Sequence, residues 1–160
     1  MSDAWPDLPT REDGPEYAVD FREHPELYRV ARGEEGVFKV DPYKSELLPL
    51  WGYADSETAA EAAEAIYERF RDYREQGDFV GMDMARKYLQ MGYTRAMRYA
   101  KYPGGQKYAE EGAERTEREP EQWADPEKRA AAEVFEEYLD RVREDDYYQQ
   151  AKELHRERWG

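Results

Sequence analysis

A helical spacing of apolar residues marks three long segments of the chain. In residues 57–75, apolar side chains recur every three or four positions between mostly acidic ones, and this spacing predicts an amphipathic helix. The same spacing predicts helices over residues 79–102 and from Pro126 to Arg158, the last with a kink near residues 144–148. Ser56, Asp78 and Asp125 precede the three segments and are typical helix N-caps.

A shorter pattern precedes the helices. Residues 27–31 and 37–40 are apolar runs on either side of a glycine-flanked turn, which favours a β-hairpin. Residues 41–48 favour a single helical turn, which Pro49 ends. Residues 1–16 hold three prolines and few apolar groups, so we expect a disordered or loosely packed arm. The predicted fold is one globular domain over residues 17–160, of the α+β class and mostly helical: three main helices and a small β-hairpin covering one end.

Composition narrows the class of protein. The 160 residues include 38 acidic and 24 basic side chains, a formal charge of −14, and only seven of the bases are lysines. Such diffuse acidity is typical of a halophilic protein, whose charge maintains solubility in a salt-rich cytoplasm. The chain has no cysteine, which excludes disulfides and thiolate metal sites. It has no apolar run of membrane-spanning length and no signal peptide, so we expect a cytoplasmic protein.

One segment departs from this acidity. Residues 77–108 carry two acidic and six basic residues, whereas both flanking segments are strongly acidic. On a helix at 100° per residue, Lys87, Arg98 and Lys101 fall on the polar face of segment 79–102, and Arg86 and Arg95 fall at its borders. The segment is therefore predicted to present a basic outer face.

Glycines mark the middle and the end of this basic helix. Gly92 in mid-helix costs about 1 kcal/mol relative to Ala, which indicates close approach by another element. After the helix, Gly104-Gly105 gives a backbone-exposed loop with Lys107 at its edge.

We predict a non-enzymatic binding protein that contacts phosphates, either the backbone of a nucleic acid or a phosphorylated ligand, through this basic face and loop. The contacts would come from Lys87, Arg98 and Lys101, flanked by Arg86, Arg95, Lys107, Gly104 and Gly105, with Tyr43 and Lys44 completing the site. Two alternatives stay open. The basic helix can pair internally with the acidic helices, as a structural or interaction domain, or it can dock an acidic protein partner.

Two long motifs resemble a known family. The stretches "DFREHPELYRVARGEEGVFKVDPYKSELLPLW" and "GDFVGMDMARKYLQMGYTRAMRYAKYPGGQKY" are similar to sequences of the domain-of-unknown-function family 4385, which groups uncharacterised short proteins of bacteria, archaea and phages. The resemblance covers most of residues 17–108. It implies no established activity, cofactor or catalytic residue, and it suggests that the two motifs share one surface or core.

Motifs of catalytic chemistry are sparse. Gly104-Gly105-Gln106-Lys107 lacks P-loop spacing, and no GxGxxG occurs. His24 and His155 are far apart and have no partners at metal-ligand spacing. We therefore expect no metal and no cofactor. An enzyme of unknown class is a further alternative, which no sequence motif supports.

Overall fold

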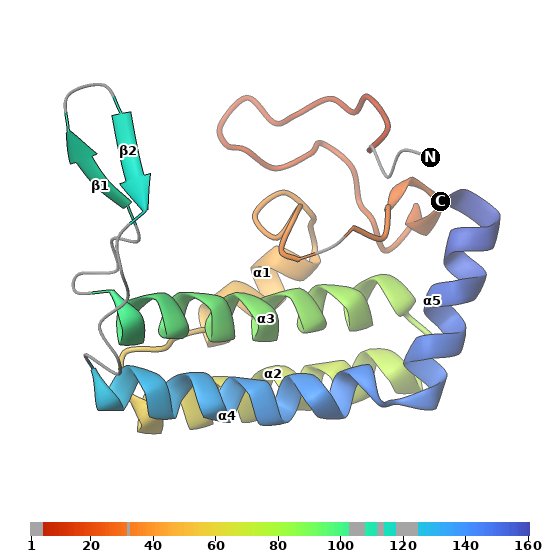
Figure 1. Cartoon of the computed structure of the whole chain (residues 1–160). Coiled ribbons are helices and arrows are strands. Elements are labelled where there is room, and N and C mark those ends of the chain that lie inside the picture. Colours follow the sequence, from red (N-terminus) through yellow and green to blue (C-terminus); the bar gives the residue numbers. More distant parts are fainter. Residues whose placement is uncertain (1–4, 32, 103–107, 112–113, 118–124) are drawn as a thin grey trace.

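The structure, a computed structural model, describes residues 5–31, 33–102, 108–111, 114–117 and 125–160 (Figure 1). Its helical elements are two 3-10 turns, η1 (Pro25–Leu27) and η2 (Leu48–Leu50), and the helices α1 (Tyr43–Leu47), α2 (Ser56–Glu75), α3 (Phe79–Lys101), α4 (Pro126–Arg143) and α5 (Asp146–Trp159). Two short antiparallel strands, β1 (Tyr108–Glu111) and β2 (Glu114–Glu117), pair with each other. Helices α2, α3 and α4 lie side by side, and α5 runs across one end of this bundle (Figure 1).

The three long helices begin close to the predicted positions. Asp78 and Asp125 are N-caps, as predicted: the Asp78 carboxylate accepts a hydrogen bond from the amide of Gly81, and the Asp125 carboxylate caps α4 in the same way. The N-cap of α2 is Asp55 instead of Ser56, since the Asp55 carboxylate accepts from the Thr58 amide at 2.7 Å. Each cap satisfies amide groups that have no partner within the helix.

Glycine lets α3 approach its neighbours closely. A Cβ atom on Gly92 would lie 2.5 Å from the ring of Phe135 on α4, and one on Gly81 would lie 2.5 Å from the ring of Tyr73 on α2. Both rings are buried in the common core. The predicted close approach at Gly92 is therefore confirmed, and the approaching element is α4.

The predicted α+β class is wrong, because in the part of the chain that the structure describes the packed body is formed by helices alone. Residues 27–40 form the end of η1 followed by extended chain and turns, without a strand among the described residues of this segment. The short β1–β2 ribbon lies elsewhere in the sequence and stands away from the helices (Figure 1). It therefore does not cover an end of the bundle as the predicted hairpin would.

The carbonyl groups of segment 28–37 explain why it forms no hairpin. Side chains of α3 bind several of them: Arg86 donates to the Ala31 and Gly33 carbonyls, Lys87 to Glu35, and the Tyr88 hydroxyl to Val37. At the start of the segment, Nε2 of His155 donates to the Tyr28 carbonyl at 2.6 Å. Buried backbone groups need hydrogen-bond partners. Here side chains of the helices supply the donors that a neighbouring strand would supply in a hairpin.

The C-terminal helix is interrupted where a kink was predicted. Helix α4 ends at Arg143, and Asp145 caps the start of α5 by accepting from the Tyr148 amide at 2.8 Å. At the other end of the chain, the described part of the predicted arm contacts the core. The ring of Trp5 lies edge-on against Tyr28, with 5.1 Å between ring centres.

Candidate anion-binding cleft

The N-terminal half of α3 is buried on all sides, including the face predicted to be polar. Residues 79–89 are all buried, among them Asp83, Arg86 and Lys87. Helices α2, α4 and α5 and the segment 28–40 surround this half of the helix. The expected outward orientation of Lys87 is therefore wrong, and the buried charges must be satisfied inside the protein.

Asp83 is the centre of a buried polar network. Its carboxylate accepts hydrogen bonds from the hydroxyls of Tyr28 and Tyr148, the latter at 2.6 Å, and pairs with the guanidinium of Arg86 at 3.0 Å. Burial opposes the charged form, but Arg86, Lys87 and the two hydroxyls together lower the pKa of Asp83 to about 2. Asp83 is therefore an anion at any physiological pH.

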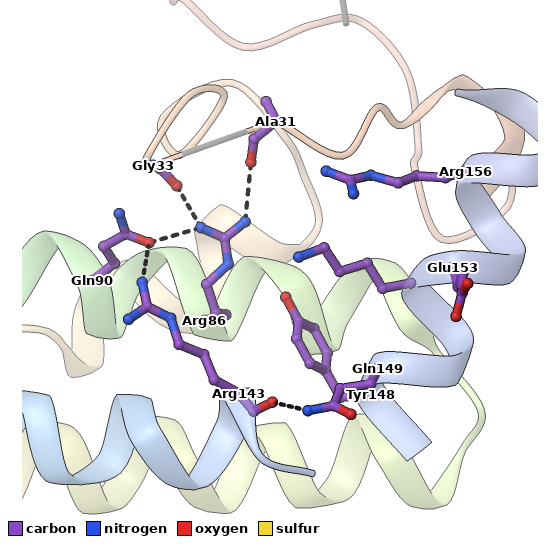
Figure 2. Close-up of a pocket in the computed structure, with 10 residues that line it drawn as sticks. Ala31, Gly33, Arg86, Gln90, Arg143, Tyr148, Gln149, Glu153 and Arg156 are labelled. Atoms are coloured by element: carbon purple, nitrogen blue, oxygen red, sulfur yellow. Dashed lines mark hydrogen bonds between the residues drawn. The ribbon is translucent and has the colours of Figure 1, made fainter. Parts of the chain in front are cut away.

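Arg86 uses all five of its N–H groups within the protein. Besides Asp83, its guanidinium donates to the carbonyls of Ala31 and Gly33 and to the side-chain oxygen of Gln90, at 3.2, 2.6 and 2.9 Å (Figure 2). A guanidinium has five donors in a fixed plane. Arg86 therefore has a structural role: it binds Ala31 and Gly33 to α3 and has no donor left for a ligand.

Lys87 lies on the other side of this network. Its ammonium donates to the Glu35 carbonyl at 2.5 Å and lies over the rings of Tyr28 and Trp5, at 4.7 and 5.3 Å from their centres. Burial lowers the pKa of Lys87 to about 8, although the nearby Asp83 carboxylate opposes this shift. The predicted phosphate contact at Lys87 would require the side chain to leave a fully buried position.

The other predicted site residues lie in separate places. Arg95, Arg98 and Lys101 are partly or fully exposed on the C-terminal half of α3, and within the described residues none of them lies in an ion pair. Lys44 pairs with Glu16 on another surface, and the buried Tyr43 hydroxyl donates to Asp78. Gly104, Gly105 and Lys107 lie outside the described residues. The predicted phosphate-binding residues that the structure describes therefore do not form one continuous site.

A cleft of about 680 Å³ opens where α5 meets α3 and the end of α4. Ala31 and Gly33 form one wall, called the 31–33 wall below (Figure 2). Gln90 and Arg86 lie along α3, and Arg143 comes from the end of α4 (Figure 2). Helix α5 contributes the remaining lining residues, which are Tyr148, Gln149, Lys152, Glu153 and Arg156. Arg156 extends from α5 toward the 31–33 wall (Figure 2).

Unpaired positive charge distinguishes this cleft. Arg86 is neutralised by Asp83, but Lys152 and Arg156 have neither an ion pair nor a hydrogen bond from their charged groups in the described part of the chain. The Arg143 guanidinium makes one long contact within the described ranges, to Gln90 at 3.4 Å. Against these three cations, the lining residues include one exposed carboxylate, Glu153. The cleft is therefore cationic in a protein of charge −14.

The cations of the cleft are close enough to disturb one another. Burial lowers the pKa of Lys152, and the charges of Arg156, Arg86 and Arg143 lower it further against the opposing Asp83. Lys152 and Arg156 are four residues apart on α5, where like charges destabilise a helix by about 0.2–0.5 kcal/mol. An anion bound between them would relieve this repulsion.

Chemically, the cleft offers flexible cationic donors and two amide side chains. An ammonium and two guanidinium groups match the oxygens of a phosphate. A metal would need several carboxylates or imidazoles, and no group of three such side chains occurs within the described ranges. In the same residues, no helix is long and apolar enough to span a membrane.

Reasoning from sequence missed most of the cleft. Arg143, Lys152 and Arg156 lie in a segment, 109–160, that is strongly acidic when counted as a whole. The net charge of this segment does not reveal the three bases, which come together only because α5 runs across the end of the bundle. The i, i+4 spacing of Lys152 and Arg156 was the one available signal, because it places both on one face of a helix.

The described residues form a small helical protein with a cationic cleft between α3 and α5. Residues 11–158 match the family described as "Domain of unknown function (DUF4385)", so the chain belongs to that family, as its two long motifs indicated. The comparisons with curated proteins and with solved structures gave no match.

Proposed function

We propose that this chain is a binding protein for a small phosphorylated ligand whose phosphate group occupies the cleft between α3, α5 and the 31–33 wall. The observation that carries this proposal is the convergence of Lys152, Arg156 and Arg143 without carboxylate partners among the described residues. Three cations opposed by Glu153 leave a net charge of about +2, which a dianionic phosphate neutralises.

The buried network under the cleft supports the proposal by fixing the geometry. Tyr148 is 3% exposed, and its hydroxyl is held by Asp83, which also orients Arg86. Arg86 in turn holds both the wall and Gln90. A site whose walls are fixed before the ligand arrives loses less entropy on binding.

Isothermal titration calorimetry of the full chain with inorganic pyrophosphate tests the proposal. The wild type should bind, and K152Q/R156Q should lose at least about tenfold in affinity, because two charge-assisted contacts are removed. The matched control is R69Q/R71Q, which removes the same charge from the exposed face of α2 and should bind like the wild type. No binding by the wild type, or equal loss in both variants, would contradict the proposal.

The stability of the free protein separates a binding role from a structural one. If Lys152 and Arg156 only repel each other in the absence of a ligand, K152Q/R156Q should melt at the same temperature as the wild type or higher. A lower melting temperature would indicate that these cations stabilise the fold. Glu153→Gln should tighten pyrophosphate binding, because it removes the one opposing carboxylate of the lining.

A further inference from the structure

A second surface combines exposed cations with aromatic rings, away from the cleft. Its rings are Trp51 and Tyr53, from the segment between η2 and α2, and Tyr99 of α3. Its cations are Arg95 and Arg98 of α3 and Lys128 of α4. We call these six residues the aromatic–basic face. None of them lines the cleft.

The rings form a short series of neighbours. Trp51 and Tyr53 have ring centres 5.0 Å apart, and Tyr53 and Tyr99 have ring centres 5.9 Å apart. All three rings are partly exposed. The indole nitrogen of Trp51 donates to the Tyr88 carbonyl at 3.0 Å, which anchors the series to α3.

Two of the three cations lie over these rings. The Lys128 ammonium is 4.8 Å from the ring centre of Tyr53 and 5.5 Å from that of Tyr99, and the Arg95 guanidinium is 6.0 Å from that of Trp51. Arg98 is exposed one residue before Tyr99. The partly exposed Lys101 lies three positions after Arg98, so it neighbours Arg98 on α3 and adds a further cation at the edge of the face. Contact with a ring attracts a cation but leaves its charge uncompensated.

The acidic residues near this face have other partners. Lys128 contributes to lowering the pKa of Asp55, but the hydrogen bond from the Thr58 backbone is the larger cause, and that carboxylate caps α2. The Glu127 carboxylate accepts from the amide and the hydroxyl of Ser56. Arg95, Arg98 and Lys128 themselves form no ion pair with any residue that the structure describes.

We infer that the aromatic–basic face binds single-stranded nucleic acid. Cations contact the phosphates, and unpaired bases stack on the partly exposed rings, which is the combination used by proteins that bind single strands without reading sequence. The bases of a duplex are already stacked on each other, so the rings give no advantage to double-stranded nucleic acid. Stacking also persists when salt screens the charges, as in a salt-rich cytoplasm.

Fluorescence anisotropy with a fluorescein-labelled oligothymidylate tests the inference on the full chain. The wild type should bind it more tightly than a labelled duplex. R98E/K101E should weaken binding at least about tenfold through the lost phosphate contacts. Tyr99→Leu should weaken it about fivefold or more, the effect of one lost stacking contact, whereas Tyr99→Phe should bind like the wild type. Circular dichroism should show that each variant remains folded.

Two control variants test whether the aromatic–basic face binds the oligonucleotide independently of the cleft. R69E/R71E makes the same charge reversal on exposed α2 positions, and K152Q/R156Q removes the cleft cations; both should bind the oligonucleotide like the wild type. The inference is overturned if the wild type does not bind, if the duplex binds equally well, or if Tyr99→Leu has no effect. It is also overturned if a polyglutamate peptide competes as well as unlabelled oligothymidylate, since the face would then serve an acidic protein partner.

Discussion

At the scale of single residues, Asp83 is the central acceptor of the buried polar network on α3. It is the one carboxylate in the buried network, and Tyr28, Tyr148 and Arg86 all donate to it. Removing one partner of a buried ion pair costs much more than the pair itself contributes, because the other charge remains in a place from which water is excluded. The stability of the protein should therefore be most sensitive at this position.

Asp83→Asn should lower the free energy of unfolding by about 3 kcal/mol, because Arg86 would keep its buried charge without a carboxylate. Asp72→Asn changes an exposed carboxylate on α2 and is the matched control; it should change stability by less than about 0.5 kcal/mol. Urea unfolding followed by circular dichroism measures both. A small effect at Asp83 would mean that the network is not important for stability.

Lowering the pH should remove the contribution of Asp83 to the free energy of unfolding. Its pKa is lowered in the folded state, from an ordinary 3.8 to about 2, so its stabilising effect is complete above pH 4 and is lost as the pH falls toward 2. The shift corresponds to about 2 kcal/mol. The difference in unfolding free energy between wild type and Asp83→Asn should therefore shrink over this range. A difference that stays constant down to pH 2 would contradict the shift.

Lys87 should also make stability rise with pH, but in the alkaline range. Burial lowers its pKa to about 8 from an ordinary 10.5, so between these values the unfolded chain binds more protons and stability rises with pH. Lys87→Met should remove this rise, whereas Lys39→Met, at an exposed lysine, should keep it. Urea unfolding between pH 7 and about pH 9.5 measures the slope below the range where tyrosines ionise. Equal slopes in all three proteins would show that Lys87 is not buried as described.

At the scale of elements, local patterns determined the helices but not what surrounds them. Apolar spacing and the caps at Asp78 and Asp125 located α2, α3 and α4, because these signals act within one or two turns. The segment 27–40 has a hairpin pattern as well, but its carbonyls are bound by Arg86, Lys87 and Tyr88 from α3. Such long-range contacts are not visible in a local pattern, so the strand prediction failed there.

Gly92 provides the test of packing between α3 and α4. Gly92→Ala should raise the free energy of unfolding by about 1 kcal/mol through helix propensity. It should lower it by a larger amount, within about 1–3 kcal/mol, because the new methyl group would meet the Phe135 ring at 2.5 Å. The net result should be a lower melting temperature. Adding Phe135→Leu to this variant should recover part of the loss by making room. A more stable Gly92→Ala protein would contradict the close approach.

At the scale of the whole molecule, two places among the described residues combine several cations that have no carboxylate partner, although the net charge is −14. One is the cleft with Lys152 and Arg156, and the other is the aromatic–basic face. The sequence indicated that α3 carries exposed bases, and Arg98 fits that expectation. The cleft could not be predicted, because it requires knowing that α5 turns across the bundle and brings its bases toward α3.

The acidic exterior should make stability depend on salt. Raising the KCl concentration screens repulsion among carboxylates, so the melting temperature should increase with salt. E61Q/E64Q/E68Q, which removes three exposed carboxylates from α2, should show a smaller increase. Differential scanning calorimetry over a KCl series measures both slopes. A melting temperature that falls with KCl would contradict this account of the surface charge.

A crystal structure of the full chain grown with inorganic pyrophosphate tests the central claim most directly. We expect the anion between α3 and α5, within hydrogen-bonding distance of the Lys152 ammonium and the Arg156 guanidinium, with Arg86 still bound to Asp83. A cleft that stays free of pyrophosphate at saturating concentration, or one in which Lys152 and Arg156 turn away from the bound anion, would contradict it.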